Sequence, residues 1–129
     1  DNRALDLWKV DNFDTNETHL YVIATLEERA DTKKLQFEIN SFNIFTFNMR
    51  TFKVSILLFT ENTSLIHVKP FKNSKQSINY MNLIKNNRNV FDVIEGVEQV
   101  QLVMSESNLE ILKKEKDIEL YLKFYQRNY

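Results

Sequence analysis

The stretch KVSILLFTENTSLIHV, residues 53–68, decides the fold expected for this chain. Apolar residues alternate with others along residues 53–60, which is the period of a β-strand. Residues 61–64 are polar and turn-forming, and residues 65–68 are again apolar. Because the connection is short, we predict a hairpin of two antiparallel strands.

The segment before this hairpin predicts a strand followed by a helix. Residues 19–26 are apolar at both alternating sets of positions, which is typical of a central strand. Asp31 can cap a helix, because its side chain can accept a hydrogen bond from the first turn. Leu35, Ile39 and Phe42 follow at the i, i+4, i+7 spacing of a buried helix face.

The segment after the hairpin predicts a helix followed by a strand. We expect Pro70 to end the preceding strand, since proline lacks the backbone donor that a sheet needs. Asn73 or Ser74 can cap a helix that runs to about Asn86. Residues 97–104 then alternate as a fourth strand.

The predicted order is therefore βαββαβ. Past Ser105 the pattern returns to helical, and we expect a short turn around residues 109–112 and a final helix with a stripe that includes Tyr121 and Tyr125. This order is typical of an α+β, ferredoxin-like antiparallel sheet, here with an extra C-terminal helix. Right-handed crossovers would place the first and third strands in its centre. Residues 1–18 are expected to form a lead-in segment, and residues 19–129 a single domain.

One face of this sheet is predicted to lie away from the two crossover helices. Because it is largely apolar, we expect either the final helix or a partner to cover it, and the final helix is preferred. The residues assigned to this face are Tyr21, Ile23, Ser55, Leu57, Phe59, Gln99 and Gln101.

Composition argues against several classes of function. The chain of 129 residues has 17 Lys and Arg against 18 Asp and Glu, so no basic field favours nucleic acid as a partner. It has no cysteine, hence no thiolate nucleophile, disulfide or cysteine-bound zinc. No run approaches the roughly 20 apolar residues of a membrane-spanning helix.

The sequence offers no recognisable catalytic constellation. His19 and His67 lack an acidic or histidine partner at helical or strand spacing, so we expect structural hydrogen bonds from them. With a single glycine, the chain has no phosphate-binding loop. The carboxylate pairs Glu27–Glu28 and Asp117/Glu119 are interpreted as solvated surface. We therefore predict no enzyme, no cofactor and no small-molecule substrate.

Aromatic residues crowd the middle of the chain. On a ferredoxin-like sheet they could stack on single-stranded RNA, but the basic residues of that module are missing, so we expect core packing. The residues concerned are Phe42, Phe45, Phe47, Phe52 and Phe59.

Three motifs, in order, carry a resemblance to a known family. They are NSFN at residues 40–43 leading to Phe47, LIHVKPFKNSKQSINY at residues 65–80, and DIELYLKFYQRNY at residues 117–129. This order resembles the C-terminal domain of the tetratricopeptide-repeat lipoproteins of gliding motility and type IX secretion, the SprE and PorW family. Ser77 stands where that family usually has alanine.

The resemblance implies a non-enzymatic scaffold domain on the periplasmic side of the outer membrane. Its partners would be proteins of the periplasmic ring and of the outer-membrane translocon, and a lipid anchor outside this chain would hold it at the membrane. The candidate partner contacts are Lys69, Lys72, Tyr121, Phe124 and Tyr125. A peptidoglycan-binding module of the SPOR type, which shares this order of elements, stays open as the alternative.

Overall fold

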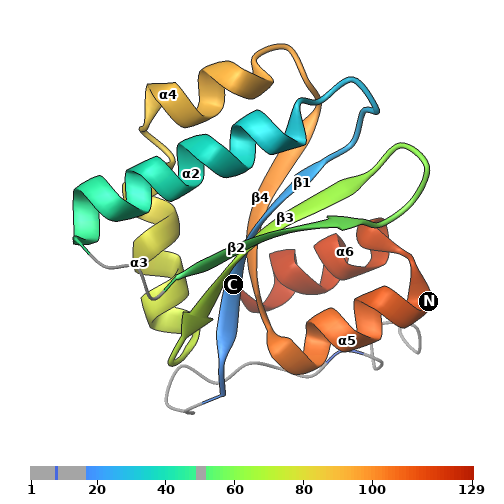
Figure 1. The fold of residues 1–129 in the computed structure, drawn as a ribbon. Helices are drawn as coiled ribbons and strands as arrows, with labels where there is room; N and C mark the ends of the chain where they lie inside the picture. Colours follow the sequence, from blue (N-terminus) through green and yellow to red (C-terminus); the bar gives the residue numbers. More distant parts are fainter. Residues whose placement is uncertain (1–7, 9–16, 49–51) are drawn as a thin grey trace.

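Four antiparallel strands form one sheet, and helices lie on both of its faces (Figure 1). The computed structural model describes Trp8, residues 17–48 and residues 52–129. The lead-in segment predicted at residues 1–18 therefore lies largely outside the described residues. The elements are β1 (His19–Thr25), α2 (Thr32–Phe47), β2 (Lys53–Leu58), β3 (Ser64–Phe71), α3 (Ser74–Ile84), α4 (Arg88–Phe91), a 3-10 turn (Asp92–Ile94), β4 (Gln99–Ser105), α5 (Glu106–Glu115) and α6 (Ile118–Asn128).

The order of strands across the sheet is β2-β3-β1-β4, with β1 and β3 in the centre. Both neighbours of β1 run antiparallel to it. Together with the sequence order of the elements, this is a ferredoxin-like α+β plan with added C-terminal helices, which confirms the predicted fold class. All seven residues of β1 are buried, as its apolar character on both faces predicts.

The sheet separates two hydrophobic cores. Tyr21 and Ile23 of β1 point to the core that contains Leu35 and Ile39 of α2, and α3 closes the same side. Leu20, Val22 and Ala24 point to the opposite core, which contains Leu109, Leu112, Tyr121 and Phe124 of α5 and α6. Helices α2 and α3, with Val90 of α4, thus cover one face, and α5 and α6 cover the other.

The expectation that the C-terminal helix covers one sheet face is correct, but part of that face was assigned wrongly. Leu57 and Phe59 do belong to the core under α5 and α6. Tyr21 and Ile23 lie in the other core, and Gln101 accepts a hydrogen bond from the Tyr21 hydroxyl. Because β1 is apolar on both faces, the alternation of its residues could not show which side chains face α2 and α3 and which face α5 and α6.

Strand β3 does not end at Pro70 as predicted. It continues to Phe71, and the β1–β3 register shifts between the pairs His19↔Phe71 and Tyr21↔Val68. This irregularity gives Pro70 a place where no ladder hydrogen bond is needed, as at other bulges. The Lys69–Pro70 peptide bond is cis.

The predicted helix starts are confirmed, while one helical segment was predicted too short and another was missed. Asp31 and Asn73 cap α2 and α3 by accepting hydrogen bonds from the backbone amides of Lys34 and Gln76. The segment expected as a short turn is the ten-residue helix α5, and α4 was not predicted at all. None of the helices in the described part of the chain is long and apolar enough to cross a membrane.

Candidate functional site

The two lysines among the candidate contacts lie near the end of β3. Lys69 is half-buried, and its ammonium is 3.6 Å from a carboxylate oxygen of Glu106 on α5. Lys72 is exposed just beyond the strand, where its backbone amide donates to the side chain of Gln76. Lys69 therefore already has an ion-pair partner, whereas the Lys72 side chain is open to solvent.

The three aromatic candidates lie on α6, and two of them are buried. Tyr121 and Phe124 pack in the core beneath α6, and Trp8 meets the Tyr121 ring edge-on at 5.0 Å between ring centroids. A partner could reach these two rings only if α6 moved. Tyr125 is half-buried and stacks on Tyr129 at 4.7 Å.

His67 lines a polar cavity of about 310 Å³ between β3 and α5. Its side chain is 8% exposed, and its Nδ1 atom is buried without a hydrogen-bond partner among the described residues. The other lining residues are Lys69, Glu106, Ser107, Leu109, Glu110 and Lys113. The cavity thus combines an imidazole, a hydroxyl and two ion pairs, the second being Lys113–Glu110 at 3.1 Å.

The electrostatics of this cavity keep His67 neutral. Burial, together with the nearby ammonium groups of Lys69, Lys113 and Lys53, lowers the pKa of His67 to about 4. The Ser107 hydroxyl donates to the carboxylate of Glu17 instead of to the imidazole. A neutral imidazole and a hydroxyl committed elsewhere do not form the nucleophile–base pair that acyl transfer requires.

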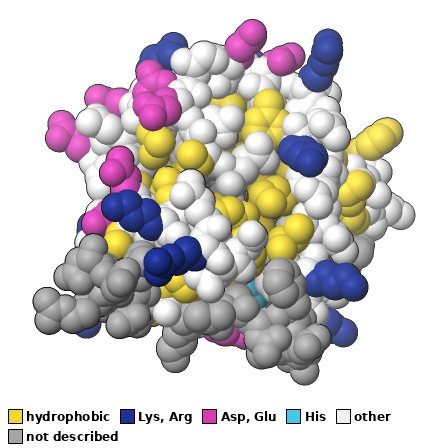
Figure 2. All heavy atoms as spheres, turned by 180° about the vertical axis from the view of Figure 1, so that it is seen from behind, with side chains coloured by type: hydrophobic (Ala, Val, Ile, Leu, Met, Phe, Trp, Pro, Cys, Tyr) yellow, Lys and Arg dark blue, Asp and Glu magenta, His cyan; other side chains and the backbone are white. Residues whose placement is uncertain are grey.

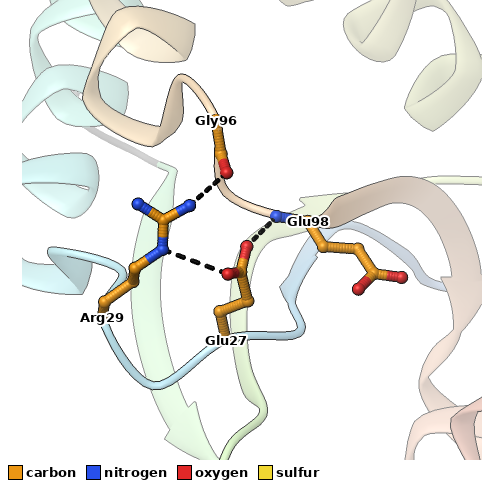
Figure 3. Close-up of polar contacts among 4 residues, drawn as sticks. All are labelled: Glu27, Arg29, Gly96 and Glu98. Carbon is orange, nitrogen blue, oxygen red and sulfur yellow. Dashed lines mark hydrogen bonds and ion pairs between the residues drawn. The ribbon is translucent and has the colours of Figure 1, made fainter.

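The carboxylate Glu27, considered above as surface, has a structural role. It accepts hydrogen bonds from the backbone amide of Glu98 and from Arg29, whose guanidinium also donates to the carbonyl of Gly96 (Figure 3). The backbone amide of Glu98 and the Arg29 side chain lower the pKa of the Glu27 carboxyl. These contacts tie the loop after β1 to the turn before β4, where Gly96 has a φ of +75° that suits glycine.

Asp117 and His19, which the sequence offered as possible acid–base groups, also have structural roles. Asp117 caps α6 by accepting from the backbone amide of Leu120, so the Asp117/Glu119 pair is part of a helix start. His19 forms hydrogen bonds with the carbonyl of Glu17 at 2.9 Å and with the Tyr129 hydroxyl at 3.2 Å. The second bond joins β1 to the end of α6.

An aromatic cavity of about 200 Å³ lies between the C-terminal end of α2 and α3. Phe47 and Tyr80 stack at 5.8 Å, and the Tyr80 hydroxyl donates to the buried side chain of Asn43. Burial raises the pKa of Tyr80, so its hydroxyl stays protonated. The remaining lining residues are Phe52, Phe71, Gln76, Asn79 and Leu83.

Large apolar side chains are exposed on the outer side of α2. Phe45 is 90% exposed, Phe37 65% and Ile44 50%, and Leu83 of α3 is also exposed. We use the name α2–α3 surface for these four exposed side chains, three on α2 and one on α3. The prediction that Phe45 packs in the core is wrong, whereas Phe42 and Phe59 are buried as expected.

The sequence contains a signal for this surface. Phe37 and Ile44 are seven residues apart and lie on the side of the helix opposite the buried stripe of Leu35, Ile39 and Phe42. A second apolar stripe on an amphipathic helix marks surface that the chain itself does not cover.

Apolar surface also occurs on the side of the molecule opposite to the view of Figure 1. There, hydrophobic side chains gather across the middle, and charged side chains lie mainly around them (Figure 2). An apolar centre with a charged rim is the usual arrangement of a protein–protein contact surface.

No family model, curated protein or solved structure matches this chain. Within the described ranges, no group of three or more His, Asp or Glu side chains is arranged to hold a metal ion.

Proposed function

We propose that this chain is a non-catalytic protein-interaction domain that binds a protein partner through the α2–α3 surface. The observation that carries the proposal is the exposure of Phe37, Ile44 and Phe45 on one helix. Aromatic and aliphatic side chains that a chain leaves exposed together are typical of binding surfaces. The aromatic cavity beside Leu83 would add a pocket for an apolar side chain of the partner.

The resemblance of the three sequence motifs gives this proposal a particular setting. In that setting the domain is the C-terminal part of a type IX secretion or gliding-motility lipoprotein. It connects the periplasmic ring or motor with the outer-membrane translocon, on the periplasmic side of that membrane. The cavity at His67 supports a non-enzymatic role, because its imidazole is neutral and the Ser107 hydroxyl donates to Glu17.

The peptidoglycan-binding alternative needs an open sheet face with polar and aromatic groups. Helices α2 and α3 cover one face, and α5 and α6 cover the other. The covered faces favour a protein partner over a glycan strand.

The test is a binding measurement with purified ring and translocon proteins from the presumed secretion system. We expect the Phe37→Asp/Phe45→Asp variant to bind about tenfold or more weakly, because desolvated aromatic residues dominate such contacts. Both side chains are largely exposed, so the fold should be retained, which circular dichroism checks.

Leu58→Asp is the matched control, since Leu58 is also exposed and apolar but lies on β2. Equal binding by the wild type and the double variant would refute the α2–α3 surface as the binding site. Sedimentation of the domain with purified peptidoglycan, unchanged in the double variant, would instead favour the glycan-binding alternative.

A further inference from the structure

Strand β2 is an edge of the sheet, and its second half is open on the outer side. The Gln36 side chain donates to the carbonyl of Val54 at 2.8 Å, so the backbone of Val54 faces away from β3. Because successive residues of a strand alternate in the direction of their backbone groups, Ile56 and Leu58 also face outward. No hydrogen bond from a described side chain covers these two residues as Gln36 covers Val54.

The side chains of this open half are aliphatic. Leu58 is 71% exposed, and Ile56 and Leu57 are half-buried, on opposite faces of the sheet. An exposed apolar edge with free backbone groups favours pairing with another strand. Such pairing would satisfy the amides and carbonyls and remove Leu58 from water.

The other edge of the sheet is less suited to pairing. On β4 the Tyr121 hydroxyl donates to the carbonyl of Val103 at 2.9 Å, which blocks that position. By alternation the remaining outward residues are Gln99 and Gln101, whose polar side chains gain little from burial. The aliphatic edge is therefore the one that favours strand addition.

We propose that two copies of this chain pair antiparallel through β2, with Leu57 opposite Leu57 of the second copy. In this register Ile56 of each copy pairs with Leu58 of the other, so their outward backbone amides and carbonyls form hydrogen bonds with each other. These bonds do not require the carbonyl of Val54, which already accepts from Gln36. The sheet continues from four strands to eight.

Charge supports a second copy of the same chain as the occupant. Lys53 is exposed at the start of β2, and Glu61 is exposed in the turn beyond its end. Antiparallel pairing about Leu57 places Lys53 of each copy opposite Glu61 of the other, so that the ammonium and carboxylate groups attract each other. This inference does not depend on the partner proposed for the α2–α3 surface.

The absence of cysteine allows a clean cross-linking test on the full chain. In a non-hydrogen-bonded antiparallel pair the Cα atoms are about 4.5 Å apart, which lies within the range of a disulfide. Leu57→Cys should therefore form an intermolecular disulfide under mild oxidation at least tenfold faster than Ser55→Cys. In the proposed register residue 55 of each copy lies opposite residue 59 of the other, so the two residues 55 are offset along the strands by about 13 Å, at roughly 3.3 Å per residue.

Light scattering supplies the second readout. The average mass should rise from 15.5 kDa toward twice that value with concentration. Leu58→Lys should keep the chain at the monomer mass, whereas Leu83→Lys on α3 should dimerise like the wild type. A chain that stays monomeric at about millimolar concentration, or equal cross-linking of the two cysteine variants, overturns the proposal. Preferential cross-linking of Gln101→Cys would show that the chains pair through β4 and not through β2. None of these results bears on the binding of a partner at Phe37 and Phe45.

Discussion

At the scale of single residues, His67 is the side chain whose chemistry the fold changes most. Burial beneath α5 and the ammonium groups of Lys69, Lys113 and Lys53 favour its neutral form by lowering its pKa. Glu106 and Glu110 line the same cavity but are paired with Lys69 and Lys113. The imidazole therefore remains uncharged throughout the pH range in which a free histidine would titrate.

This neutrality predicts a loss of stability on acidification. The unfolded chain binds a proton at His67 with a pKa near 6.5, whereas the folded chain does so with a pKa of about 4, so the free energy of unfolding falls as the pH drops between these values. His67→Gln has no proton to bind and should show a smaller fall. Urea unfolding of both proteins at pH 7 and pH 5 measures the difference, and parallel falls would contradict it.

Some features of single residues could not be predicted from the sequence. A helix stripe that contacts the chain's own sheet has the same pattern as one that contacts a partner, so Tyr121 and Phe124 could be placed on α6 but not in the core. The cavity at His67 could not be predicted either, because β3 and α5 are brought together by the return of the chain after β4.

At the scale of elements, local signals were the most predictive. Asp31 and Asn73 begin their helices by hydrogen bonds within three residues, which requires no tertiary contact. The length of β3 depends instead on its neighbours, because the shift in register at β1 accommodates Pro70. The starts of capped helices can thus be predicted from the sequence, whereas the ends of strands depend on how the strands pair.

Helix α6 is expected to depend strongly on Phe124. Its buried ring lies 6.4 Å from the ring of Trp8, the single tryptophan of the chain. Phe124→Ala should lower the free energy of unfolding by about 3–5 kcal/mol, the usual cost of removing a buried aromatic ring.

Urea unfolding followed by Trp8 fluorescence measures this effect, and the folded variant should also emit at longer wavelength as water reaches the indole. The exposed Phe45 supplies the control, because Phe45→Ala should change stability by less than about 0.5 kcal/mol. Equal stabilities of the two variants would show that the α6 core is not closely packed.

At the scale of the whole molecule, the sheet holds the two helical layers together. β1 lies between β3 and β4, and all of its residues are buried. Opening either layer alone would leave its backbone hydrogen bonds in place. We expect the amides of β1 to exchange with deuterium more slowly than those of the edge strand β2, in dilute solution where dimers are few. Faster exchange in β1 than in β2 would contradict this order.

The alternation of β1 between two cores also bears on how the sequence tolerates change. Leu20 and Tyr21 are neighbours in the chain, yet they contact different cores, while Leu20 and Leu112 are far apart in the chain and share one. Substitutions that share no neighbours combine additively, and those within one core do not. Epistasis in this domain should therefore follow the side of the sheet instead of distance along the chain, so that odd and even positions of a single strand evolve under separate constraints.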